Sequence, residues 1–122
     1  MILSMSNIKK KFGNFTALEL DKLEFEEGKY YVVLCPSGYG KTTLLRIVFD
    51  LEFSDSGQII ILAKDMTNAP AWKRDIGLEF QNYALYPHLT VYENIASPLS
   101  VMKIHRNEIV KRVLTVNGNI YI

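Results

Sequence analysis

The chain has 122 residues, of which 48% are hydrophobic and 22% charged, and its formal net charge is +1. This balance gives no electrostatic reason to expect nucleic acid or an acidic lipid surface as a partner. The length suits one domain with a buried core and excludes two complete domains. The single cysteine excludes an internal disulfide and favours a reducing compartment. Because no apolar run approaches the ~20 residues of a spanning helix, we expect a domain that can lie beside a membrane but cannot cross one.

The first predicted elements are three strands and a helix. Residues 2–10 and 15–25 mix strand-forming residues with charges, which is typical of an antiparallel sheet with one face in solvent. Tyr30 to Leu34 has no polar alternation, and this predicts a strand buried on both faces. A helical pattern follows from Thr42 to about Asp50. We therefore expect an α/β domain in which a few parallel strands accompany the antiparallel sheet.

Further elements are predicted beyond this helix. An apolar run at residues 58–63 indicates another strand of the antiparallel sheet, and residues 75–80 indicate a short one. Residues 90–93, Thr-Val-Tyr-Glu, have the spacing of a capping box, in which the threonine hydroxyl and the glutamate satisfy each other's free backbone amides. A helix from Val91 to about Ala96 should follow, bent or ended by a proline, and a second helix should begin near Asn107.

The clearest chemistry lies between the predicted buried strand and the first helix. This stretch reads Cys35-Pro36-Ser37-Gly38-Tyr39-Gly40-Lys41-Thr42-Thr43. A strand, a glycine-containing loop, Lys-Thr and a helix in that order are typical of a phosphate-binding loop. Backbone amides at a helix amino terminus converge on phosphate oxygens, and the helix dipole adds to the attraction. The alternative is a Gly-rich turn between strand and helix with no ligand.

Individual residues of this loop have separate predicted roles. Lys41 would reach the β- and γ-phosphates of a nucleotide, Thr42 would ligate Mg2+ through its hydroxyl, and Thr43 would bond the α-phosphate. Cys35 departs from the usual pattern, because it stands where the first glycine is expected. If that position needs a positive φ, its β-carbon costs about 1–2 kcal/mol. A cysteine thiol near a helix amino terminus would also be reactive. The alternative for Cys35 is a small apolar residue that ends a buried strand.

Two more stretches accompany the phosphate loop. Residues 11–18 read Lys-Phe-Gly-Asn-Phe-Thr-Ala-Leu, and residues 80–95 read Phe-Gln-Asn-Tyr-Ala-Leu-Tyr-Pro-His-Leu-Thr-Val-Tyr-Glu-Asn-Ile. With the loop, they resemble the ATP-binding subunits of ABC transporters, particularly importers of sugars, polyamines and oxyanions. The resemblance implies an α/β P-loop NTPase fold of the ABC ATPase type with an antiparallel β-subdomain. It makes residues 1–115 the N-terminal part of the ATP-binding domain and leaves residues 116–122, a predicted turn and strand-like stub, unassigned.

The resemblance also implies ligands and partners. Phe12 would stack on the adenine of ATP, although a core or turn aromatic is the alternative. Gln81 would contact Mg2+ and the attacking water, so that Lys41 and Gln81 would serve the catalytic step; most lone glutamines are simply solvated. The segment from Gln81 to Asn94 would contact the transmembrane permease. Two such subunits form a homodimer around ATP, on the cytoplasmic side of the cell membrane.

Three further family elements do not occur in the sequence. They are the signature loop Leu-Ser-Gly-Gly-Gln, an apolar strand ending in Asp-Glu, and a later catalytic histidine. The resemblance thus implies a form truncated before the second half of the domain, in which hydrolysis is slow or undetectable. Two functions follow: a subunit that couples ATP binding and hydrolysis to solute import, or a non-hydrolysing remnant that holds nucleotide or a partner. An unrelated P-loop kinase or GTPase would leave the segment at Gln81 unexplained.

Overall fold

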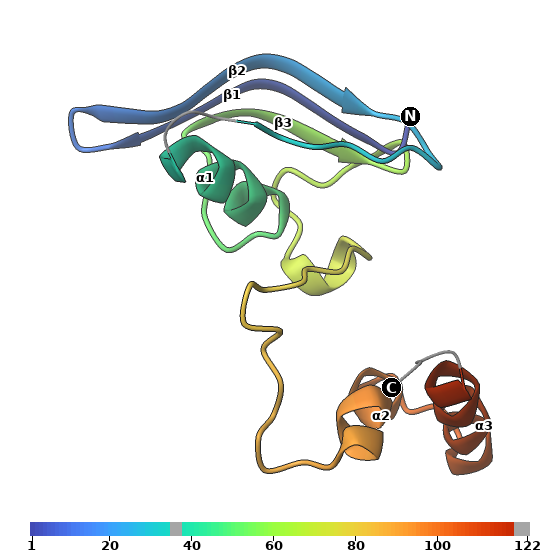
Figure 1. Cartoon of the computed structure of the whole chain (residues 1–122). Helices are drawn as coiled ribbons and strands as arrows, with labels where there is room; N and C mark the ends of the chain where they lie inside the picture. The colour runs from blue at the N-terminus through green and yellow to red at the C-terminus, as the bar shows by residue number, and fades with distance from the viewer. Residues whose placement is uncertain (35–37, 119–122) are drawn as a thin grey trace. The chain divides into compact units, whose positions relative to one another are not determined.

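The computed structural model describes residues 1–34 and 38–118. The chain divides into two compact units, Met1–Leu78 and Glu79–Ile122. The first unit contains a four-stranded sheet, the helix α1 (Gly38–Val48) and a short 3-10 turn at Ala71–Lys73 (Figure 1). The second contains the helices α2 (Val91–Val101) and α3 (Arg106–Gly118). In the part of the chain that is described, no helix has the length and apolar character needed to span a membrane.

The sheet is antiparallel and has the order β2-β1-β3-β4. Its strands are β1 (Leu3–Phe12), β2 (Phe15–Phe25), β3 (Ser56–Ile61) and β4 (Lys64–Asp65). β1 is central because it pairs with β2 through a tight hairpin and with β3 on its other side. These strands confirm the predicted antiparallel sheet, with β3 beginning and ending slightly earlier than the sequence indicated.

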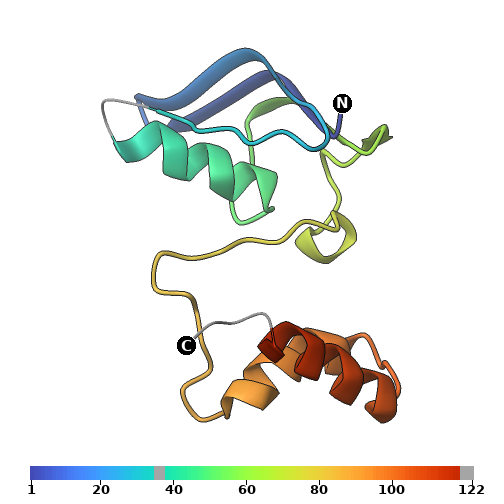
Figure 2. The ribbon, with the colours of Figure 1, turned by 45° about the vertical axis from the view of Figure 1, so that its right-hand side comes forward.

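The core of the first unit lies between one face of the sheet and α1. Figure 2 shows α1 running across that face. Leu44, Ile47 and Val48 recur at helical spacing and are buried against Met5, Ile8, Ile59 and Ile61. Met5 and Ile8 are three positions apart, which strict strand alternation would place on opposite faces. Asn7 resolves this conflict, because it has a φ of 52° where the pairing of β1 with β3 shifts register.

Two predicted strands are wrong. Tyr30 to Leu34 is neither a strand nor buried, since Tyr30, Val32 and Leu34 are 92%, 66% and 87% exposed. Residues 75–80 also form no strand. Both segments are absent from the sheet pairing of the described residues, which is antiparallel throughout. An apolar run becomes a strand only when another strand pairs with it, and a parallel partner must be carried alongside by a crossover connection.

The second unit is a helix pair with its own small core. Ala96 on α2 packs with Ile109 and Val113 on α3. The predicted capping box at the start of α2 is present. α2 continues past Pro98 instead of ending near Ala96, because the proline removes only one helical hydrogen bond and the bond from Met102 N to Pro98 O follows at 3.1 Å. α3 runs to Gly118, so the turn predicted from residue 117 is helical at its start, and the predicted stub at residues 119–122 lies outside the described residues.

Candidate functional site

The first turn of α1 coincides with the predicted phosphate loop. α1 begins at Gly38, so Gly40, Lys41 and Thr42 lie at its amino-terminal end. Lys41 is half-buried and Thr42 is exposed, whereas Thr43 is buried, with 7% of its surface exposed. The structure therefore brings the Lys-Thr pair to a helix amino terminus, as the motif requires.

Charge at this helix end favours an anion. The first turn of α1 contains no acidic residue, whereas α2 and α3 carry Glu93 and Glu108 in theirs. A carboxylate in the first turn partly neutralises the positive end of a helix dipole. α1 keeps that positive end and adds Lys41, so a phosphate is electrostatically favoured there.

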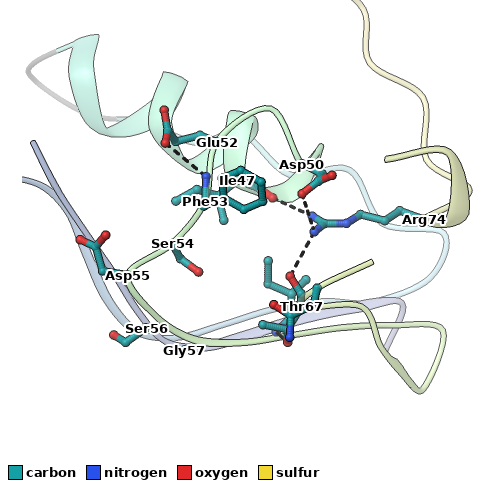
Figure 3. Close-up of a pocket in the computed structure, with 12 residues that line it drawn as sticks. Ile47, Asp50, Glu52, Phe53, Ser54, Asp55, Ser56, Gly57, Thr67 and Arg74 are labelled. Carbon is teal, nitrogen blue, oxygen red and sulfur yellow. Dashed lines mark hydrogen bonds and ion pairs between the residues drawn. The ribbon is translucent and has the colours of Figure 1, made fainter. Parts of the chain in front are cut away.

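A buried arginine anchors the opposite end of α1. Arg74 is 2% exposed, and its Nη1 donates to the carbonyl of Ile47 at 2.7 Å (Figure 3). The same nitrogen donates to the carbonyl of Val48, also at 2.7 Å. Its Nε donates to Ala69 O at 2.8 Å. Burial lowers the pKa of the guanidinium below its ordinary value, and the neighbouring Asp50 carboxylate partly opposes this shift. A cation at the carboxyl end of α1 stabilises the helix through its dipole.

A pocket of about 200 Å³ lies beside this anchor. Figure 3 shows Asp50 and Thr67 pointing toward the guanidinium, with Glu52 and Asp55 farther along the wall. The remaining nitrogen of Arg74, Nη2, donates to Thr67 O at 3.3 Å and lies 3.4 Å from Asp50 Oδ1. Every nitrogen of the guanidinium is therefore hydrogen-bonded within the protein, and the pocket lies against the anchor of α1.

Phe12, the predicted adenine platform, is the last residue of β1. The residue is 49% exposed, and the ammonium of Lys10 lies 5.1 Å from its ring centroid. Lys10 also forms an ion pair of 2.8 Å with Glu52. Figures 1 and 2 both show α1 beginning at the end of the sheet where β1 turns into β2. The first unit thus places this half-exposed ring and the start of α1 at the same end.

The other predicted site residues are not brought together by the described structure. Gln81 is exposed and lies in a turn of the second unit, so its meeting with Thr42 at Mg2+ stays a prediction. Tyr83 and Ala84 in that turn have φ of 63° and 49°. Cys35, Pro36 and Ser37 lie outside the described residues, as does the side chain of Tyr39.

Comparison with known proteins decides the family. A family model described as ABC transporter matches residues 18–120. The chain belongs to the ABC transporter family.

Relatives of this ABC chain include importer subunits. It is 45% identical over 111 residues to the spermidine/putrescine import ATP-binding protein PotA of Thermotoga maritima, covering 91% of this chain and 30% of that protein. It is 48% identical over 106 residues to the Fe(3+) ions import ATP-binding protein FbpC of Brucella abortus, covering 87% of this chain and 30% of that protein. The chain thus spans about a third of the length of these relatives.

A solved structure confirms the fold. The dimeric ATP-binding cassette MJ0796, in a post-hydrolysis state bound to ADP and Pi, matches with a TM-score of 0.76 and 29% identity. The match covers 93% of this chain and 55% of that one. The predicted ABC ATPase fold with its antiparallel sheet is therefore confirmed.

Sequence reasoning missed two residues of this region. Arg74 stands in the run Trp-Lys-Arg-Asp, where nothing distinguishes a buried arginine from the exposed Lys73 before it. The sequence predicts Asn94 only as the end of a partner-binding segment, yet its side chain makes several hydrogen bonds to the backbone before α2. An asparagine four positions after an N-cap threonine is the one signal that the sequence offered for it.

Proposed function

We propose that this chain holds Mg-ATP at the start of α1 as the nucleotide-binding part of an ABC importer subunit. One observation carries the proposal: Lys41 and Thr42 lie at the amino-terminal end of a helix whose first turn has no carboxylate. Membership of the ABC family and the match to a cassette bound to ADP support it.

Each residue would contribute one interaction. Gly38 and Gly40 leave room for phosphate beside the backbone, and Lys41 supplies a point charge for the β- and γ-phosphates. Thr42, the exposed threonine of the pair, offers its hydroxyl to Mg2+, while Thr43 would bond the α-phosphate. Bound Mg2+ neutralises charge on the phosphate oxygens.

Further residues complete the proposed site. Phe12 presents half of its ring for stacking on adenine. Cys35, Pro36, Ser37 and Tyr39 would belong to the nucleotide-binding loop, and Gln81 would reach Mg2+ and the attacking water. These assignments follow from the family's motifs at matching positions.

For the importer, we propose that a homodimer of the subunit hydrolyses ATP on the cytoplasmic face of the cell membrane. Each subunit would bind a permease through the segment from Gln81 to Asn94. The named relatives import different solutes, a polyamine in one case and Fe(3+) in the other, so the solute of this transporter does not follow from this stretch. The second candidate is a remnant that binds nucleotide or a partner without turnover.

Calorimetric titration of Mg-ATP into the full chain tests the proposal. We expect micromolar binding that Lys41→Ala abolishes and that Lys64→Ala, at an exposed lysine on β4, leaves unchanged. Equal binding by wild type and Lys41→Ala would overturn the assignment of the loop. Phosphate release under the same conditions separates the two candidates, since turnover favours the importer enzyme and binding without turnover favours the remnant.

A further inference from the structure

One side chain holds the turn that precedes α2. Asn94 accepts a hydrogen bond from the backbone N–H of Tyr86 through Oδ1 at 2.9 Å. Its Nδ2 donates to the carbonyls of Tyr86 at 3.2 Å, Leu89 at 3.1 Å and Thr90 at 2.9 Å. Both ends of the amide therefore bind backbone, and the pair of bonds to Tyr86 fixes the orientation of the amide as well as the position of the turn.

The far end of the same turn is closed by the capping box. Thr90 N donates to Glu93 Oε2 at 2.7 Å, and Glu93 N donates to Thr90 Oγ1 at 3.2 Å. Leu89 N donates to Tyr86 O at 3.1 Å, which closes the turn internally. The hydrogen bonds from Thr90 lower the pKa of Glu93, with a smaller contribution from His88. The turn, residues 86–90, is thus fixed to the first turn of α2 by α2's own residues.

Polar backbone groups of the turn are hydrogen-bonded within the protein, whereas several of its side chains are exposed to solvent. Tyr86 is 53% exposed, and the neighbouring Leu85 and Val91 are 67% and 68% exposed. His88 is exposed too, and its ring meets that of Tyr86 edge-on with centroids 6.1 Å apart. Exposed aromatic and aliphatic side chains on a fixed backbone are what a protein partner can bind with little loss of conformational entropy.

We propose that Asn94 is a positioning residue for partner binding. It holds residues 86–90 in the shape that presents Tyr86 and His88 to the permease, a protein partner and not a nucleotide. The inference rests on the proposed contact of the permease with Gln81 to Asn94. Asn94 would set the geometry of that contact without touching the permease itself.

Two variants separate the shape of the turn from the stability of α2. Asn94→Ala removes all four bonds. Asn94→Asp keeps the size of the side chain and the acceptor for Tyr86 N, but its carboxylate repels the carbonyls of Leu89 and Thr90. A carboxylate this close to the amino terminus of α2 is favourable to the helix dipole, so the aspartate variant should keep the helix while it loses the turn. Asn107→Ala, at an exposed asparagine of α3, is the matched control.

The experiment measures binding of the full chain to the permease subunits of the Thermotoga maritima spermidine/putrescine importer in lipid nanodiscs, with helix content and Mg-ATP affinity measured in parallel. We expect both Asn94 variants and Tyr86→Ala to weaken permease binding about tenfold or more, because an unfixed turn must be ordered on binding. Asn94→Asp should keep wild-type helix content, and all variants should keep wild-type Mg-ATP affinity.

The outcomes are distinguishable. Permease binding that falls in Tyr86→Ala but stays at the wild-type level in both Asn94 variants overturns the positioning role and leaves the proposed function standing. Lost binding in Asn94→Ala with normal binding in Asn94→Asp also overturns it, because helix stability would then be the cause. No binding by the wild-type chain overturns the permease contact and this inference together, while Mg-ATP titration still reports on the nucleotide site.

Discussion

The sheet of the first unit and the two segments at residues 30–34 and 75–80 were all predicted as strands, but only the sheet residues form them. β1 finds β2 through a hairpin and β3 on its other edge, so its backbone is paired on both sides. Tyr30 to Leu34 is at least as apolar, yet it is exposed and unpaired with any described strand. Strand formation here follows the availability of a partner more closely than it follows composition.

The difference has a local cause. A hairpin needs only a short connection, and Gly13 in the β1–β2 turn supplies a φ of 59° at little cost. A strand that must be central and parallel needs neighbours delivered by longer connections. Substitutions of buried residues in the paired sheet should therefore lower the free energy of unfolding, whereas substitutions in the two unpaired segments should leave it nearly unchanged.

The largest expected effect comes from Arg74, which anchors the carboxyl end of α1. Arg74→Met should lower the free energy of unfolding by about 4 kcal/mol, because buried carbonyls of Ile47, Val48 and Ala69 lose their donor and Asp50 loses its ion partner. Urea denaturation followed by circular dichroism measures this. Lys73→Met, at the exposed neighbour, is the control and should stay within about 0.5 kcal/mol of wild type. A small loss in Arg74→Met would show that the arginine is not a stabilising anchor.

A pair of truncations tests the comparison directly. Ile59→Ala, at a side chain 1% exposed in β3, should lower the free energy of unfolding by about 3 kcal/mol. Val32→Ala, at a side chain 66% exposed, should change it by less than about 0.5 kcal/mol. Both are read from urea denaturation curves. Comparable losses at the two positions would mean that residues 30–34 are paired and buried in solution, and the comparison would fail.

A glycine pair sharpens the account of the sheet. Gly57 in β3 has a φ of 104°, and a β-carbon there would lie 2.7 Å from Asn7 O and from Ile8 Cα. Gly57→Ala should therefore cost about 2 kcal/mol through strain and displacement of β1. Gly13→Ala meets no atom within 4 Å and should cost about 1 kcal/mol from its φ of 59° alone. Thermal unfolding monitored by circular dichroism ranks the two, and the reverse order would contradict the close approach of β1 and β3.

The smallest effect is a pH dependence at the edge of the sheet. Hydrogen bonds from Thr67, and then from Gln58, lower the pKa of Asp65 to about 2. Because the folded pKa lies below the unfolded one of about 3.9, this carboxylate stabilises the fold above pH ~4 and loses that contribution as the pH falls toward 2. The difference in unfolding free energy between wild type and Asp65→Asn should shrink across this range. If this difference in unfolding free energy stayed constant as the pH fell, the pKa of Asp65 would not be lowered in the folded chain.

What the sequence could predict depended on how local the signal was. The antiparallel pairing of β1 with β2, the capping box of Thr90 and Glu93, and the first helix are all set by residues close together in the chain. The helix was predicted from Thr42 to about Asp50, and α1 begins and ends earlier, at Gly38 and Val48. The buried state of Tyr30 to Leu34 was mispredicted because burial needs distant neighbours that a pattern does not contain. Arg74 escaped notice for the same reason, since its acceptors at residues 47 and 48 lie 27 and 26 positions away.

The acceptors of Arg74 also bear on how this sequence can change. Most are main-chain carbonyls, those of Ile47, Val48, Thr67 and Ala69, and these remain whatever side chains the four positions carry. Substitutions at those four positions should leave the hydrogen bonds of Arg74 intact, provided that the new side chains are similar in size and polarity. Arg74 has no such freedom, because the three donors of a lysine radiate from a single nitrogen and cannot reproduce the planar fork of a guanidinium. Lineages that diverge from this chain should vary the partners and keep the arginine.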